Sequence, residues 1–207
     1  MTKVLLVILL VLGTFFAVWY FFSKEEPVEK TKKEGPIIFF GNSLTAGVGA
    51  GEGEDFPSLV AKELNLSNVI NAGVSGDTTE TALARLEADV LDKNPSLVVV
   101  ELSGNDFLQQ LPVEETIKNL DSIVNQIRKT GAAVVLVHIK FPQKSSEYEA
   151  GFKKIAKKYK ATVVWDVLDG IAGNPSLMAD EIHPNNAGYK IMAQRIAKVL
   201  RELLQPH

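Results

Sequence analysis

The chain has 207 residues, with 22 basic and 25 acidic side chains and a formal net charge of −3. Its length suits one domain of ordinary size with an appendage, and its charge balance offers no basic face for nucleic acid. The absence of cysteine excludes disulfides, thiolate metal sites and a cysteine nucleophile.

An uncharged apolar segment occupies residues 4–22. As a helix it would span about 28 Å, close to the thickness of a bilayer core, and Trp19 and Tyr20 near its end favour the membrane interface. A cleaved signal peptide is an alternative, but the segment runs into Phe21 and Phe22 without an Ala-x-Ala cleavage site. A buried core helix would not be apolar all round. We therefore predict an uncleaved membrane anchor over residues 1–22.

Residues 23–35 form a predicted polar linker ahead of a domain at residues 36–207. The segment holds four lysines, four glutamates and Pro27, without apolar periodicity, so it cannot bury enough surface to fold alone. Basic residues flank both sides of the anchor. Their count favours a cytoplasmic domain, whereas a single N-terminal anchor more often exports the domain attached to it. We expect the domain on the extracytoplasmic side, in the periplasm or at the cell surface.

From residue 36 onward, short apolar runs alternate with amphipathic segments. We expect strands at residues 37–40, 69–71, 97–102, 133–139 and 162–165. We expect helices at residues 56–64, 113–129, 148–159 and 187–204, and one from a capping box at residues 77–80 to about residue 91. Strands that are apolar on both faces and alternate with helices predict an α/β domain whose parallel sheet is covered on both sides.

Ligands of such sheets bind beyond the carboxyl ends of the strands, and the polar motifs fall there. Ser43 follows the first strand in a turn between Gly41 and Gly47. A serine needs an adjacent base to act as a nucleophile. Taken alone, this segment is more typical of an ordinary turn, and it is not the G-x-S-x-G elbow of the α/β-hydrolases.

The expected base is His183, in the loop before the last helix. Asp180 lies three residues earlier and can accept the imidazole N–H and fix its tautomer. An Asp-x-x-His pair alone is a weak signal, and a polar loop ending at Pro184 is the alternative. His138 lies within an apolar strand and is expected to be structural.

The amide of Asn105, in a Gly-rich turn, can donate to a developing oxyanion. The backbone N–H groups of Gly73 and Ser43 can supply two further donors. The alternative for Asn105 is a left-handed turn residue. Asp77 and Asp106 are expected to be structural, the first as a helix cap and the second as a loop tie.

No metal ion or cofactor is expected. The chain has no His-Glu-x-x-His motif and no pair of histidines at ligand spacing. Residues 47–51 are glycine-rich but lack the lysine of a phosphate loop and the strand–helix context of a dinucleotide motif.

Four blocks of the chain, the Ser43 turn and residues 71–78, 100–106 and 182–184, resemble the SGNH hydrolase superfamily of GDSL esterases and lipases. More narrowly, they are similar to its bacterial arylesterase, thioesterase and lysophospholipase group, and the likeness extends from residue 36 to about residue 204. The resemblance implies a three-layer α/β/α sandwich of flavodoxin-like type, with about five parallel strands and no cofactor.

The resemblance also implies roles for the site residues. It assigns the catalytic triad to Ser43, Asp180 and His183, and the oxyanion hole to Ser43, Gly73 and Asn105. Asn42 stands where the family has an aspartate, so we expect the chemistry to survive with altered local hydrogen bonding. The resemblance places Phe107, Leu108, Leu111, Phe141 and Pro142 along the substrate, although ordinary packing would explain them as well.

These observations predict a membrane-tethered serine esterase that hydrolyses acyl and aryl esters, with thioesters and lysophospholipids as further substrates. Its expected partners are therefore a small-molecule or lipid ester and the membrane. One alternative is a cell-envelope carbohydrate O-deacetylase of the same fold, which an open, polar site would favour over an apolar groove. Another is a non-catalytic binding protein with a relict site.

Overall fold

The structure is a computed structural model that describes residues 34–204. Its centre is a five-stranded parallel sheet in the order β2-β1-β3-β4-β5. The strands are β1 (Ile37–Gly41), β2 (Val69–Gly73), β3 (Leu97–Glu101), β4 (Ala133–Val137) and β5 (Thr162–Val164). This order is that of flavodoxin-like sheets, so the predicted α/β class, strand number and topology are confirmed.

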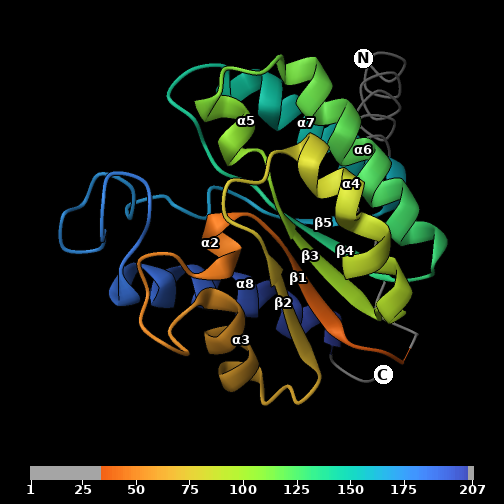
Figure 1. Ribbon diagram of the computed structural model, residues 1–207, viewed down its shortest axis with the longest axis horizontal. Helices are drawn as coiled ribbons and strands as arrows, with labels where there is room; N and C mark the ends of the chain where they lie inside the picture. The colour runs from red at the N-terminus through yellow and green to blue at the C-terminus, as the bar shows by residue number, and fades with distance from the viewer. Residues whose placement is uncertain (1–33, 205–207) are drawn as a thin grey trace, which may run out of the picture.

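Helices cover both faces of the sheet (Figure 1). One layer contains α4, α6 and α7, and the other contains α3 and α8, as their mutual contacts also show. The longer helices are α3 (Phe56–Leu64), α4 (Thr79–Asp89), α6 (Val113–Lys129), α7 (Ser145–Tyr159) and α8 (Asn186–Leu204). The short helical segments are α2 (Ser43–Ala46), α5 (Gly104–Leu108) and the 3-10 turn η1 (Leu91–Lys93).

The three inner strands are buried at every position, whereas the edge strands β2 and β5 are partly accessible. At the carboxyl ends of β1, β2 and β3 the register aligns Gly41 with both Gly73 and Glu101. Three chain-distant segments thus end side by side at one edge of the sheet. The residues just beyond these strand ends are held close together by the sheet itself.

Two short helices replace turns that the sequence predicts. Ser43 is the first residue of α2, and Asn105 lies in α5. The left-handed residue before α5 is Ser103, with a φ of 110°, so the alternative interpretation of Asn105 as a left-handed turn residue is excluded. Helices this short have no periodicity to detect and depend on their tertiary surroundings.

The cap of α4 also differs from the prediction. Thr78 is the N-cap residue and forms a capping box with Thr81, in place of Asp77 and Glu80. The carboxylate of Asp77 instead accepts from Thr81 Oγ1 at 2.9 Å and from Arg85 Nε at 2.6 Å. Its ion pair with the arginine therefore fixes the first two turns of the helix from outside.

The predicted anchor at residues 1–22 and most of the linker lie outside the described residues, so both stay predictions. Between residues 34 and 204, no helix combines the length and apolarity needed to cross a membrane.

Candidate active site

The nucleophile candidate Ser43 is presented at the carboxyl end of β1 by a tightly packed turn. A Cβ atom at Gly41 would lie 2.2 Å from Thr45 Oγ1 and 2.4 Å from the Glu101 carbonyl oxygen, so only glycine fits there. Asn42 then caps α2, its Oδ1 accepting from the Leu44 N–H at 3.0 Å. Ser43 is thereby the first helical residue, where backbone N–H groups have no intrahelical partner.

The His183 loop is organised by Asp180. One carboxylate oxygen of Asp180 accepts from the backbone N–H groups of Ile182 and His183, each at 2.7 Å. The other lies 2.8 Å from His183 Nδ1. The hydrogen bonds from the His183 side chain, the His183 N–H and the Ile182 N–H lower the pKa of Asp180 to about 2. The carboxylate is therefore ionised at neutral pH and aimed at the imidazole.

Ser43, His183 and Asp180 form a continuous hydrogen-bonded chain. His183 Nε2 lies 3.0 Å from Ser43 Oγ, although the two residues are 140 positions apart in the sequence. A neutral imidazole whose Nδ1–H donates to Asp180 presents Nε2 as an acceptor for the serine proton. The arrangement can therefore activate the hydroxyl as a nucleophile.

The segment after α2 packs against the loop that holds His183. Gly49 has a φ of 90°, and a Cβ atom there would lie 2.6 Å from the Pro184 carbonyl oxygen and 3.2 Å from His183 Cβ. Tyr189 of α8 donates its hydroxyl to the Val48 carbonyl at 2.8 Å. These contacts join the loop after the serine directly to the loop that holds the histidine.

Of the two other predicted oxyanion donors, Asn105 is the better prepared. Its Nδ2 donates to the Asp77 carbonyl at 2.8 Å, which orients the amide and leaves its second hydrogen for another acceptor. The Gly73 N–H already donates to Asn71 Oδ1 at 2.9 Å. An oxyanion would therefore have to compete with Asn71 for the single hydrogen on Gly73.

Packing explains why residue 73 is a glycine. A Cβ atom at Gly73 would lie 2.2 Å from the backbone nitrogen of Ala46, so β2 ends directly against α2. At Gly104 the corresponding point lies 3.6 Å from Asn42 Nδ2, which places the start of α5 beside the cap of α2. The segments that hold Gly73 and Asn105 thus flank the short helix that begins at Ser43.

Comparison with known proteins agrees with this geometry. Residues 39–191 match the GDSL-like lipase/acylhydrolase family. The chain belongs to this family. It is 32% identical over 178 residues to esterase TesA of Pseudomonas aeruginosa, covering 81% of this chain and 89% of the relative. It is 30% identical over 175 residues to thioesterase 1/protease 1/lysophospholipase L1 of Escherichia coli, covering 81% and 84%.

Solved structures support the same assignment. The crystal structure of TesA superimposes with a TM-score of 0.77 at 31% sequence identity, covering 82% of this chain and 99% of that chain. The family resemblance drawn from the sequence motifs is therefore confirmed, and with it the hydrolase class of the chain.

In this GDSL-family domain, four of the five predicted substrate-wall residues line one cavity. The cavity has a volume of about 530 Å³. It is lined by Phe107, Leu108, Gln110, Leu111, Pro142, Gln143, Lys144 and Tyr148. The fifth predicted residue, Phe141, stacks on Phe107 with ring centroids 4.3 Å apart and an interplanar angle of 11°. Phe107 and Leu108 follow Asn105 on α5, so the cavity adjoins the helix that carries this donor.

Exposed apolar side chains also lie close in sequence to the predicted site residues. Val48, Val74, Leu108 and Ile182 are each more than a third exposed. Each lies within five residues of Ser43, Gly73, Asn105 or His183. The segments that carry the predicted site residues therefore also present apolar side chains to solvent.

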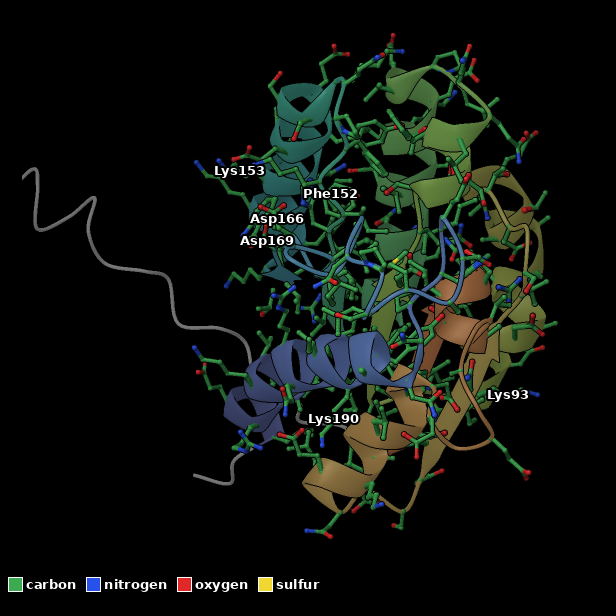
Figure 2. The ribbon with its side chains drawn as sticks, turned by 90° about the vertical axis from the view of Figure 1, so that its left-hand side faces the viewer. Lys93, Phe152, Lys153, Asp166, Asp169 and Lys190 are labelled. Carbon is green, nitrogen blue, oxygen red and sulfur yellow. The ribbon has the colours of Figure 1, made fainter. Side chains whose placement is uncertain are left out.

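His138 lies just beyond β4 and is buried, as expected for a structural histidine. Its Nδ1 is 2.9 Å from Asp166 Oδ1, and its ring packs between Phe152 and Trp165. Figure 2 shows Phe152 and Asp166 together on the side opposite Lys93. Burial lowers the pKa of His138, against the opposing effect of Asp166.

The sequence motifs did not identify several residues that hold this site. Asp106 was expected to be structural, and its carboxylate does accept hydrogen bonds from the Thr79 N–H at 2.9 Å and from Thr116 Oγ1 at 3.2 Å. The roles of Asn71 and Glu101 were not foreseen. The one available signal was that Glu101 is a charged residue inside an otherwise apolar strand.

Proposed function

We propose that this chain is a serine esterase that hydrolyses acyl and aryl esters, with thioesters and lysophospholipids as further substrates. The observation that carries the proposal is the chain of hydrogen bonds from Ser43 Oγ through the His183 imidazole to Asp180. Each member sits at the distance and in the order that nucleophilic acyl transfer needs.

In the proposed mechanism, Ser43 Oγ attacks the ester carbonyl carbon while His183 Nε2 takes its proton. Asp180 stabilises the imidazolium that forms. The carbonyl oxygen becomes an oxyanion, which the Ser43 N–H, the Gly73 N–H and the Asn105 amide stabilise. When the tetrahedral species collapses, the bond to the leaving group breaks and His183 returns the proton to it. Water then attacks the acyl-enzyme by the same route and releases the acid.

The surroundings of the site support an acyl substrate over a carbohydrate. The exposed apolar residues close in sequence to the triad, together with Phe107 of the cavity, can cover an acyl chain or an aryl group, while the buried Phe141 supports Phe107 by stacking on it. A sugar-binding site would be expected to present more hydrogen-bonding groups there. Gln110, Gln143 and Lys144 supply such groups in the cavity that Phe107 also lines, and they suit the polar part of an amphiphile.

We further propose that residues 1–22 tether this domain to a membrane, with the domain on the extracytoplasmic side. The support is the sequence pattern alone: an uncharged segment of bilayer length followed by a charged linker.

The deciding experiment is covalent labelling with a p-nitrophenyl phosphonate ester. The wild-type chain should be labelled once, at Ser43, and Ser43→Ala should be neither labelled nor active. Ser58→Ala is a suitable control because Ser58 lies on α3 and its hydroxyl donates to Asp55 Oδ2 at 2.7 Å. Labelling at another residue, or esterase activity in Ser43→Ala, would overturn the proposal. A panel of p-nitrophenyl esters of rising chain length, run beside an acetylated xylan, would separate the acyl-ester esterase from the deacetylase.

A further inference from the structure

A buried carboxyl group that the proposed mechanism does not use lies against α2, the short helix that begins at Ser43. Glu101 is the last residue of β3, pairs in register with Gly41, and is fully buried. Burying an ionisable group is costly unless its polar atoms are hydrogen-bonded. A carboxyl group at this position therefore requires a reason other than packing.

The contacts of Glu101 lead to the two residues that bracket the serine. Asn42 Nδ2 donates to Glu101 Oε1 at 3.3 Å, and Thr45 Oγ1 donates to Glu101 Oε2 at 3.1 Å. Asn42 is the N-cap of α2, and Thr45 lies in the middle of this four-residue helix. The carboxyl group thus binds α2 at its N-cap and at its third residue, on either side of Ser43 and Leu44.

Space for this contact is provided by Gly41. A Cβ atom on that residue would come within 3.0 Å of Glu101 Oε2 and 2.2 Å of Thr45 Oγ1. The missing side chain therefore lets the carboxyl group reach α2. Asn42, which replaces the usual aspartate of the family, matches the carboxyl group because its amide donates to Glu101 while its carbonyl accepts from Leu44.

A helix of four residues is too short to hold its own orientation, yet the hydroxyl of Ser43 has to meet His183 Nε2 at 3.0 Å. We propose that Glu101 is the positioning residue for the nucleophile: by accepting hydrogen bonds from Asn42 and Thr45, it fixes α2 and so aligns the Ser43 hydroxyl and N–H. This inference rests on the proposed function of Ser43. Burial raises the pKa of Glu101 to about 8 despite the opposing bonds from Thr45 and Asn42.

Two substitutions at Glu101 separate positioning from bulk packing. Glu101→Gln keeps an acceptor for Asn42 and a polar partner for Thr45, whose hydroxyl can accept as well as donate. Glu101→Met retains a similar length and removes both partners. We expect Glu101→Gln to keep kcat within about threefold. We expect Glu101→Met to lose roughly 10- to 100-fold in kcat, since small misplacements of reacting groups cost on that order.

The readouts are chosen so that a merely structural role would not produce the same result. In Glu101→Met, KM should change by less than about threefold, while the rate of phosphonate labelling of Ser43 falls in parallel with kcat. Val99→Ala is the matched control, because Val99 is buried on the same strand and its side chain is apolar. It should lower the midpoint of thermal unfolding and leave kcat unchanged.

The measurements use the full chain in a non-ionic detergent, with circular dichroism to verify folding. A folded Glu101→Met with wild-type kcat, or a Val99→Ala with the same loss of kcat, would overturn the inference. If Glu101→Met does not fold, Thr45→Val decides the matter. It removes one hydroxyl donor at constant shape and should lower kcat and the labelling rate by roughly 3- to 10-fold, and wild-type values would overturn the inference. The proposed function fails separately, if Ser43→Ala remains active.

Discussion

The buried carboxyl group of Glu101 predicts an unusual dependence of stability on pH. Its pKa is raised from an ordinary value of 4.5 to about 8 in the folded chain, so folding favours the protonated form. The stabilisation is fully present below about pH 4.5 and is lost as pH rises toward 8. Each unit of pKa difference corresponds to about 1.4 kcal/mol, and the whole interval therefore to as much as about 5 kcal/mol. This is a large part of the stability of a typical domain.

Glu101→Gln removes this titration and keeps the shape of the protonated acid. The free energy of unfolding should be measured by urea denaturation between pH 5 and pH 9, on residues 34–207 of both proteins. The wild type should lose stability relative to Glu101→Gln as pH rises to about 8, and the difference should then level off. Glu52→Gln, at an exposed loop position, serves as the control and should behave like the wild type throughout.

Other groups around Glu101 do not produce the same curve. Asn42 and Thr45 of α2 do not titrate in this range, and Tyr189 of α8 has its pKa raised by burial and by the charges of Glu101, Asp180 and Asp55. Arg85 donates to the Gly41 carbonyl at 3.0 Å and is present in both proteins, so it does not contribute to the difference between them. A pH-independent difference between wild type and Glu101→Gln would refute the reasoning, because Glu101 would then titrate alike in the folded and unfolded chains.

Three further predictions concern the site and the anchor. Asp180→Asn should lose roughly 10⁴ in kcat/KM, because an amide no longer selects the imidazole tautomer that the serine needs; a value near that of an Asp169→Asn control would contradict this. Since its pKa is near 2, Asp180 stabilises the loop above about pH 4 and loses this effect only on further acidification. Asn105→Ala should lower kcat by roughly 10²–10³ with little change in KM, whereas an effect on KM alone would make Asn105 a substrate-binding residue. Residues 34–207 should hydrolyse short soluble esters without residues 1–33, while the full chain should stay with membranes after carbonate extraction; an inactive truncated domain would show that the N-terminal segment contributes to the site.

The elements that the sequence predicted well are long and periodic. The bounds of α3 and α6 were predicted as observed, because their apolar positions recur at helical spacing over several turns. The short helices α2 and α5 were missed because their conformation is decided by neighbours far away in the chain. Asn42, for example, meets Glu101 across 59 positions. No local pattern can indicate such a contact.

The residues of the candidate site likewise fall into those that the sequence identified and those that it did not. Ser43 and His183 were recognisable because their motifs combine a reactive side chain with turn-forming neighbours at the ends of predicted elements. Asp180, which orients His183, was recognisable from its spacing. Asn71 was not, since a hydrogen-bonded asparagine looks the same in sequence as an exposed one, and Glu101 gave only the signal of a charge inside an apolar strand. The involvement of Asn71 with the Gly73 N–H depends on a backbone conformation that only the folded strand provides.

The path of the chain through the sheet makes this domain suitable for attachment to solid supports. The chain enters β1 at Ile37, at the end of the strand opposite to Ser43, where the Gly35 carbonyl accepts from Ser96 Oγ at 2.9 Å. Helix α8 begins at Asn186, which accepts from the Gly51 N–H, and carries the chain about 28 Å away from the site before it ends at Leu204. Figure 1 shows the Leu204 end of α8 remote from α2. A resin, an electrode or a fusion partner joined at either end of the domain would therefore leave the mouth of the active site open to substrate.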